Sequence, residues 1–179
     1  MKQTKIAFFV EGQTERIFLV KFLSEYLGGE NNFSRVELKN HGSKGVSLLA
    51  ERKYPNALFF VFIYDAGGDG NVVSALFDRV KNMIKEGYRF VYAIQDLYDT
   101  PRSKEQIVQD NFKRKEKQFG LKIQLTLILA IMEIEAWFLA DYDLFSRINK
   151  IATPAYIKEN LNIDLIKKNP ELHPHPAEV

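Results

Sequence analysis

Four apolar segments of this chain each run directly into acidic residues, and these acids are the side chains that could do chemistry. They are Glu11, Asp65 with Asp69, Asp96 with Asp99, and Glu133 with Glu135. Two carboxylates about 4 Å apart repel by roughly 4 kcal/mol at an effective dielectric of about 20, so a cluster needs a counter-charge. Oxygen ligands without cysteine favour a hard divalent cation, Mg²⁺ or Mn²⁺. Such a cation clamps phosphoryl oxygens and activates water, so the acids point to phosphoryl transfer or phosphodiester hydrolysis.

Each acid also has a simpler explanation, because a carboxylate that follows a strand can support the N-terminus of the next helix. Asp65 and Asp69 lie in a glycine-rich turn before one helical pattern, and Glu11 with Gly12 precedes another. Spacing along the chain does not separate the two roles. Convergence of the acids at one place would favour the chemical role.

The acids can converge only if the strands before them run parallel in one sheet. Apolar runs typical of buried strands occupy 6–10, 57–64, 90–94 and 121–132, with a weaker one at 33–38. Helical patterns lie between them at 14–27, 73–84 and 103–120, and 43–52 can form a short helix. This alternation predicts an α/β fold with a mostly parallel central sheet of about five strands flanked by helices. Ligands of such sheets bind at the carboxyl ends of the strands.

The first helix is expected to begin at Thr14 and to turn an apolar stripe toward the sheet. The stripe consists of Ile17, Val20, Leu23 and Leu27, which recur at helical spacing. This helix would hold the turn that carries the first acid.

Composition limits the classes of protein that the chain can be. Its 179 residues suffice to bury roughly 70% of the unfolded surface, and cysteine is absent. Disulfides, thiolate zinc sites and cysteine nucleophiles are therefore excluded. Without a signal peptide or a long uncharged apolar span, we expect a soluble cytoplasmic protein that does not bind membranes. We expect an α/β domain at 1–143 and a helical or irregular C-terminal extension at 144–179.

Basic and histidine residues add little to the functional argument. The net charge is only +2, too small to indicate nucleic-acid binding by itself. Six basic and three acidic residues between 102 and 117 could make one helix face positive, or could simply form a solvated face. His173 and His175 lie in a proline-rich terminus and are not expected to bind metal.

One motif resembles a known superfamily. Residues 10–15 read VEGQTE and are followed by Phe18 and Leu19, which resembles the opening motif of the Toprim superfamily of topoisomerases, primases and overcoming-lysogenisation-defect nucleases. Together with the segments 96–98 (DLY) and 133–135 (EIE), it is similar to uncharacterised Toprim-like proteins of bacterial mobile elements and phage defence. The resemblance implies a Toprim fold and metal-dependent chemistry on nucleic acid.

The resemblance also implies catalytic roles. The first-motif glutamate of Toprim enzymes is a general acid or base, and Glu11 matches it. Glu135 resembles the glutamate that precedes Ala-Trp in related defence proteins, so it is the second expected catalytic residue. Glu15, in the following helix, is expected to matter much less for chemistry than Glu11.

A metal site is implied less directly. Toprim enzymes hold Mg²⁺ with an Asp-x-Asp pair, whereas here Asp65 and Asp69 are four residues apart and Asp96 and Asp99 three apart. We expect Asp96 and Asp99, with Asp65 and Glu133, to bind Mg²⁺ or Mn²⁺. Asp96 ranks above Asp65 because the segment Asp-Leu-Tyr resembles the family more closely, although either aspartate pair could hold the metal. One of Glu133 and Glu135 could be a helix cap.

The expected function is a Toprim-like, Mg²⁺-dependent nuclease or nucleotidyl-transfer enzyme acting on DNA or RNA in phage defence or mobile-element maintenance. The absence of a strict Asp-x-Asp pair leaves a second hypothesis open: a catalytically weak Toprim-fold module that docks a partner protein or a nucleic acid. A receiver-like signalling domain also gathers acids at strand ends. It would need two acids after the first strand and a lysine after the last, whereas no lysine occurs between Ile123 and Arg147.

Overall fold

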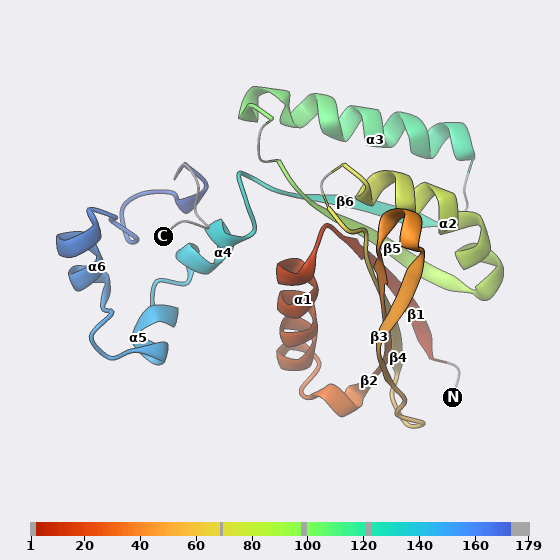
Figure 1. The fold of residues 1–179 in the computed structure, drawn as a ribbon, viewed down its shortest axis with the longest axis horizontal. Helices are drawn as coiled ribbons and strands as arrows, with labels where there is room; N and C mark the ends of the chain where they lie inside the picture. The colour runs from red at the N-terminus through yellow and green to blue at the C-terminus, as the bar shows by residue number, and fades with distance from the viewer. Residues whose placement is uncertain (1–2, 69, 98–99, 121–122, 173–179) are drawn as a thin grey trace. The chain divides into compact units, whose positions relative to one another are not determined.

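The protein is described by a computed structural model that covers residues 3–68, 70–97, 100–120 and 123–172. Its centre is a six-stranded sheet in the order β3-β2-β4-β1-β5-β6 (Figure 1). The strands are β1 (Thr4–Val10), β2 (Phe33–Asn40), β3 (Val46–Arg52), β4 (Phe59–Asp65), β5 (Tyr88–Asp96) and β6 (Gln124–Ala130). The predicted α/β fold with a mostly parallel central sheet is confirmed.

Strand β1 lies inside the sheet and runs parallel to both of its neighbours, β4 and β5. Strand β2 runs parallel to β4 on the other side of that strand. The register places Asp65 opposite Val10 of β1 and opposite Lys39 of β2. The carboxyl ends of β1, β2 and β4 therefore lie at one edge of the sheet.

The prediction of a short helix at 43–52 was wrong, since this segment forms β3, one strand more than the five expected. A single 3₁₀ turn, η2 (Gly42–Lys44), reverses the chain, and the backbone N–H of His41 donates to Gly45 O at 2.8 Å. Gly42 and Gly45 both have positive φ angles, 63° and 85°, which favour glycine. Strand β3 then pairs antiparallel with β2, so hairpin pairing overrides the local helical pattern.

Three long helices pack on the sheet: α1 (Gln13–Tyr26), α2 (Val72–Glu86) and α3 (Glu105–Phe119). Figure 1 shows α1 on one face of the sheet and α2 and α3 on the other. Helix α2 follows Asn71 and ends just before Gly87, which adopts the left-handed conformation. Helix α3 continues from a 3₁₀ turn, η3 (Arg102–Lys104).

The buried stripe of α1 differs from the prediction at one position. Leu23 is buried, and Val20 and Leu27 pack against the same core, but Ile17 is 45% exposed. Leu19, only 2% exposed, takes its place. Leu19 and Leu23 are four residues apart and so share one helix face, toward Phe8, Val10, Val61 and Ile63 of the sheet.

The opposite face of the sheet is closed by aromatic contacts. The Arg79 guanidinium of α2 donates a hydrogen bond to the Tyr64 hydroxyl at 2.7 Å and lies over the same ring. Phe77 of α2 packs against Phe112 and Phe119 of α3, with ring centroids 5.5 and 4.9 Å apart. These contacts hold α2 against the sheet and α3 against α2, so the two helices form one layer.

The chain divides into two compact units, Met1–Gln95 with Gln106–Ile128, and Asp96–Glu105 with Leu129–Val179. The second unit contains α4 (Glu135–Ala140), α5 (Leu144–Ile148) and α6 (Pro154–Leu161), with the 3₁₀ turns η4 (Pro170–Leu172) and η3. Its small core consists of Leu139, Ile157 and Leu165. Among the described residues, no helix combines the length and apolarity that crossing a bilayer requires.

Candidate functional site

Glu11 follows β1 directly and is 7% exposed. The next backbone N–H, of Gly12, donates to the Glu15 carboxylate at 2.9 Å, and the N–H of Arg16 donates to Gly12 O at 3.3 Å. Glu15 is itself only 6% exposed. Glu15 therefore closes the turn after β1, which gives it a structural role that the sequence did not indicate.

Asp65 is the last residue of β4 and is only 1% exposed, so it is more deeply buried than Glu11 at the end of the neighbouring strand β1. Its Oδ1 accepts a hydrogen bond from the backbone N–H of Gly67 at 2.9 Å. Its Oδ2 is buried and has no hydrogen-bond partner, because the Lys39 ammonium group stays 3.9 Å away. A buried polar atom without a hydrogen bond costs on the order of 1–3 kcal/mol, and more when charged. This oxygen is therefore suited to a cation.

The turn after Asp65 joins three strand ends. The N–H of Ala66 donates to Val10 O at 2.8 Å, and the N–H of Gly68 donates to Glu11 O at 3.0 Å. From the other side, the Asn40 side chain donates to Ala66 O at 3.1 Å. The structure thus brings the backbone at Glu11 and the turn after Asp65 together at the carboxyl edge of the sheet.

Gly67 is required by this arrangement. Its φ angle is +77°, and a Cβ at this position would lie 2.5 Å from Asn40 O. No side chain fits so close to a backbone carbonyl. The turn consequently holds Asp65 Oδ1 in a fixed place.

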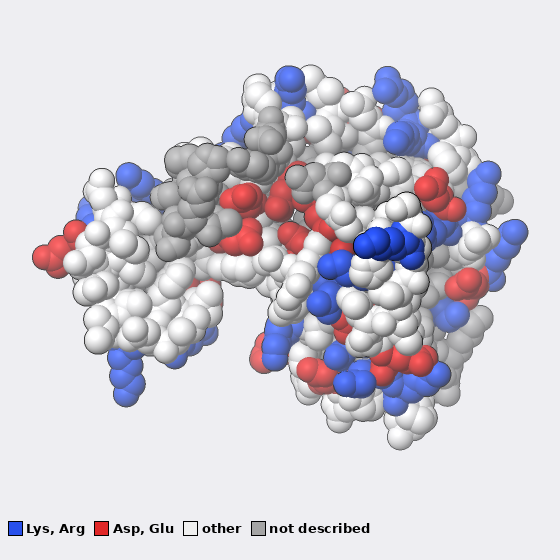
Figure 2. All heavy atoms as spheres, viewed as in Figure 1, with Lys and Arg blue, Asp and Glu red and all other residues white. Residues whose placement is uncertain are grey.

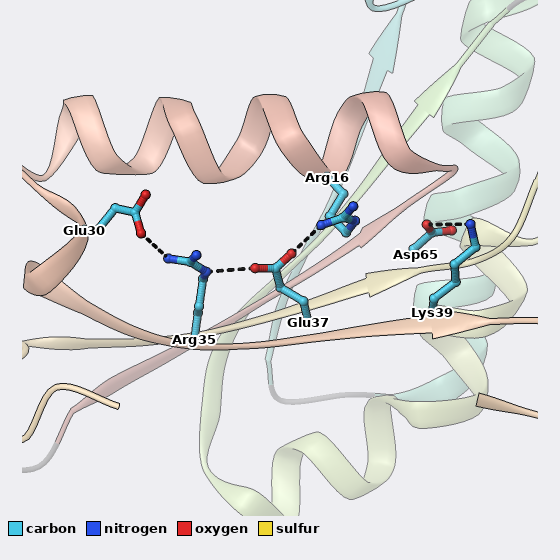
Figure 3. Close-up of polar contacts among 6 residues, drawn as sticks. All are labelled: Arg16, Glu30, Arg35, Glu37, Lys39 and Asp65. Carbon is cyan, nitrogen blue, oxygen red and sulfur yellow. Dashed lines mark hydrogen bonds and ion pairs between the residues drawn. The ribbon is translucent and has the colours of Figure 1, made fainter. Parts of the chain in front are cut away.

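A chain of ion pairs lies between β2 and α1, on the face of the sheet that α1 covers (Figure 3). Glu30 of the 3₁₀ turn η1 (Glu30–Asn32) pairs with Arg35 at 2.9 Å, Arg35 pairs with Glu37 at 2.8 Å, and Glu37 pairs with Arg16 of α1 at 2.6 Å. The hydrogen bond from Arg35 lowers the pKa of Glu30. Burial alone would lower the pKa of Arg35, but Glu30 and Glu37 outweigh it and raise that pKa. The network ties the first turn of α1 to β2.

Three further predicted acids that the structure describes, Asp96, Glu133 and Glu135, belong to the second unit. Asp96 is the last residue of β5 and is partly buried, and the next N–H, of Leu97, donates to Ala130 O at the end of β6 at 2.8 Å. Glu133 follows Met132, whose positive φ of 69° is uncommon outside glycine and marks a sharp turn. Glu135 is the first residue of α4, and a negative charge at this position stabilises the N-terminus of a helix.

Asp69 and Asp99 lie outside the described residues, as do His173 and His175. Within the part of the chain that the structure describes, no three acidic or histidine side chains form a group that could hold a metal ion. Mg²⁺ keeps several waters in proteins and is often bound by one or two carboxylates together with substrate phosphates. The buried, unbonded Oδ2 of Asp65 fits such a ligand role.

Lys39, Arg16 and Glu15 are the site residues that sequence reasoning missed. The predicted strand ended at Leu38, one residue before Lys39, and Lys39 belongs to no motif. Glu15 is the last residue of the VEGQTE motif and Arg16 follows it directly, so the motif was the one signal that could have indicated them.

Comparison with known proteins gives a family but no activity. No curated protein and no solved structure matches the chain. The model of the family DUF4276, a domain of unknown function, matches residues 10–176. That range begins just before Glu11 and contains the acids of all four strand ends. The chain therefore belongs to the DUF4276 family.

Proposed function

We propose that this chain is a Toprim-like, divalent-metal-dependent enzyme that acts on DNA or RNA in phage defence or mobile-element maintenance. It would either cleave phosphodiester bonds or transfer nucleotidyl groups. The observation that carries the proposal is the buried Asp65 carboxylate beside the Glu11 turn, with one oxygen that no hydrogen-bond donor satisfies. Ligands of open α/β sheets bind at the carboxyl ends of the strands, which is where Glu11 and Asp65 lie. The resemblance of VEGQTE to the Toprim opening motif supports the same chemistry.

Asp65 is the proposed metal ligand of the first unit, and Glu11 is its proposed general acid or base. A bound Mg²⁺ or Mn²⁺ would supply charge stabilisation at the phosphoryl oxygens and would increase the acidity of a bound water. The Glu11 side chain would accept a proton from the attacking hydroxyl as a carboxylate, or donate one to the leaving oxygen as a carboxylic acid. The Asp65 carboxylate is held by the Gly67 N–H, and the turn after Glu11 is closed by the Glu15 carboxylate. Such preorganisation would reduce the rearrangement that the reaction requires.

The acids of the second unit have proposed roles of their own. Asp96, with Asp99 and Glu133, is proposed to bind metal, and Glu135 is proposed to assist in proton transfer. Asp96 and Glu133 follow neighbouring strand ends, since Leu97 and Ala130 are joined by a backbone hydrogen bond. Substitution of Asp65 and of Asp96, one at a time, separates the contributions of the two units.

The test is a thermal melt in EDTA and in millimolar Mn²⁺, followed by a cleavage assay on single-stranded DNA, duplex DNA and RNA. A cation that binds only the native state raises Tm by mass action. We expect Mn²⁺ to raise the Tm of the wild type and to raise that of Asp65→Asn or of Asp96→Asn by less, because each variant loses one proposed ligand. Absence of a Tm shift in the wild type would refute the metal site. A Tm shift without cleavage of any substrate would favour the docking module.

A further inference from the structure

The candidate site contains a positive charge as well as acids. Lys39 and Asp65 are directly opposite each other in the β2–β4 register, and the Lys39 ammonium group lies 3.9 Å from Asp65 Oδ2 (Figure 3). The two side chains differ greatly in burial, since Lys39 is 35% exposed and Asp65 only 1%. One partner of this ion pair can therefore reach solvent and the other cannot.

The separation is too long for a hydrogen bond. Charged hydrogen bonds between ammonium and carboxylate groups are about 2.7–2.9 Å long. Lys53 reaches Glu51 at 2.8 Å, and Lys158 reaches Asp164 at the same distance, although these pairs lie at more exposed positions. Lys39 balances the charge of Asp65 without satisfying its Oδ2, which the structure leaves without a hydrogen bond.

The aspartate is the fixed member of the pair. Gly67 N donates to Asp65 Oδ1, and Gly67 is packed against Asn40 O so closely that the turn has no room for a Cβ. Lysine, in contrast, carries a compact charge on a flexible four-carbon stem. Any rearrangement at this position therefore involves Lys39.

From these observations we propose that Lys39 is a displaceable counter-ion. Its ammonium group balances the buried Asp65 charge in the metal-free protein, leaves Asp65 when a divalent cation is bound, and then binds a phosphate oxygen of the nucleic-acid substrate. This inference rests on the proposed function, because it requires that Asp65 bind the cation. A lysine that merely stabilises the fold would stay beside Asp65 in every state.

The test uses Lys39→Met, which removes the charge and keeps an unbranched side chain. In EDTA the variant should melt below the wild type, since Asp65 loses its counter-charge. Mn²⁺ should then raise its Tm by more than it raises that of the wild type, and calorimetry should show Mn²⁺ binding roughly tenfold tighter, within the usual range for couplings between ligands. Binding of a duplex oligonucleotide in Ca²⁺ should weaken, because a phosphate contact is lost.

Three further variants make the result specific. Lys53→Met removes a lysine from an exposed ion pair at the end of β3 and should leave Mn²⁺ and oligonucleotide binding unchanged. Adding Asp65→Asn to Lys39→Met should abolish the gain in Mn²⁺ affinity. If Lys39→Met does not fold, Lys39→Gln provides the same comparison with a polar side chain.

The outcomes separate the two proposals. If the wild type binds Mn²⁺ and Lys39→Met binds Mn²⁺ and oligonucleotide equally well, the counter-ion role is overturned and the metal site stands. If the wild type binds no Mn²⁺ at all, the proposed function fails, and the counter-ion role fails with it.

Discussion

The Glu15 carboxylate accepts a hydrogen bond from the backbone N–H of Gly12 at 2.9 Å, which closes the turn directly after Glu11. The bond pairs a charged acceptor with one of the first N–H groups of α1, as in a capping box. Glu15 thus connects the local geometry of the first helical turn to the position of the candidate catalytic acid.

Glu15→Ala should consequently lower the free energy of unfolding by about 0.5–2 kcal/mol, the usual cost of losing a helix cap. Urea denaturation measures the change. Gln13→Ala is the matched control, since Gln13 lies in the same turn but is exposed. Equal stability of the two variants would show that the Gly12 bond does not stabilise the turn.

Gly67→Ala should destabilise the protein more than Gly70→Ala does. The two glycines have nearly equal φ angles, +77° and +75°, so both substitutions cause similar backbone strain. Only at Gly67 would the new Cβ meet another atom, Asn40 O at 2.5 Å, whereas none lies within 4 Å at Gly70. The difference between the two melting temperatures therefore measures the close contact that fixes the turn after Asp65. A difference of zero would show that the turn can move away.

Glu30 should make stability depend on pH. Its hydrogen bond from Arg35 lowers its pKa in the folded protein below the ordinary value of 4.5. A lowered pKa means that its contribution is present above about pH 4.5 and is lost as the pH falls through the folded pKa. The wild type should therefore be more stable than Glu30→Gln near neutral pH, and the gap should close on acidification. Urea denaturation at several pH values tests this, and a gap that stays constant with pH would contradict it.

The sequence predicted the sheet well where strands are continuous and apolar. β1 and β4 are such strands, and both end at a buried acid. The helix expected at 43–52 failed because β3 is defined by its partner β2 and not by its own composition. Its exposed Leu48 and Leu49 carry no alternating pattern that would indicate a strand.

The candidate site was predictable in its acids but not in its supporting contacts. Glu11 and Asp65 could be placed because each follows an apolar run. The ion pairs of Arg35 and Lys39 depend on the β2–β4 register, which no local pattern specifies. Contacts between segments far apart in the chain emerge only with the folded sheet.

A basic stretch of α3 offers a test of nucleic-acid binding. Lys113, Arg114, Lys115 and Lys117 are exposed, and the charged side chains that Figure 2 shows over this helix, on the face drawn, are mainly basic. If the helix contacts the phosphate backbone, Lys113→Glu with Lys117→Glu should weaken duplex DNA binding. The slope of log K against log salt should also fall by about 0.9 for each lost contact. Lys53→Glu, at an exposed lysine away from α3, is the control. An unchanged salt slope would mean that the basic face is only solvated.

Glu11→Gln is the decisive variant for the proposed chemistry. Glutamine keeps the shape of the side chain at this 7%-exposed position but cannot exchange a proton, so folding should be nearly unaffected. Because metal binding is assigned to Asp65, Asp96, Asp99 and Glu133 and not to Glu11, the rise in Tm with Mn²⁺ should also persist. Cleavage should fall by the roughly 10²- to 10⁴-fold that general acid–base groups contribute. Glu15 cannot serve as the control, since it caps the Gly12 turn and its substitution would shift Glu11. Glu51→Gln, at a partly exposed glutamate on β3, is suitable instead and should cleave at the wild-type rate. If Glu11→Gln also cleaves at that rate while Asp65→Asn is inactive, proton transfer belongs to another group, for which Glu135 is the next candidate.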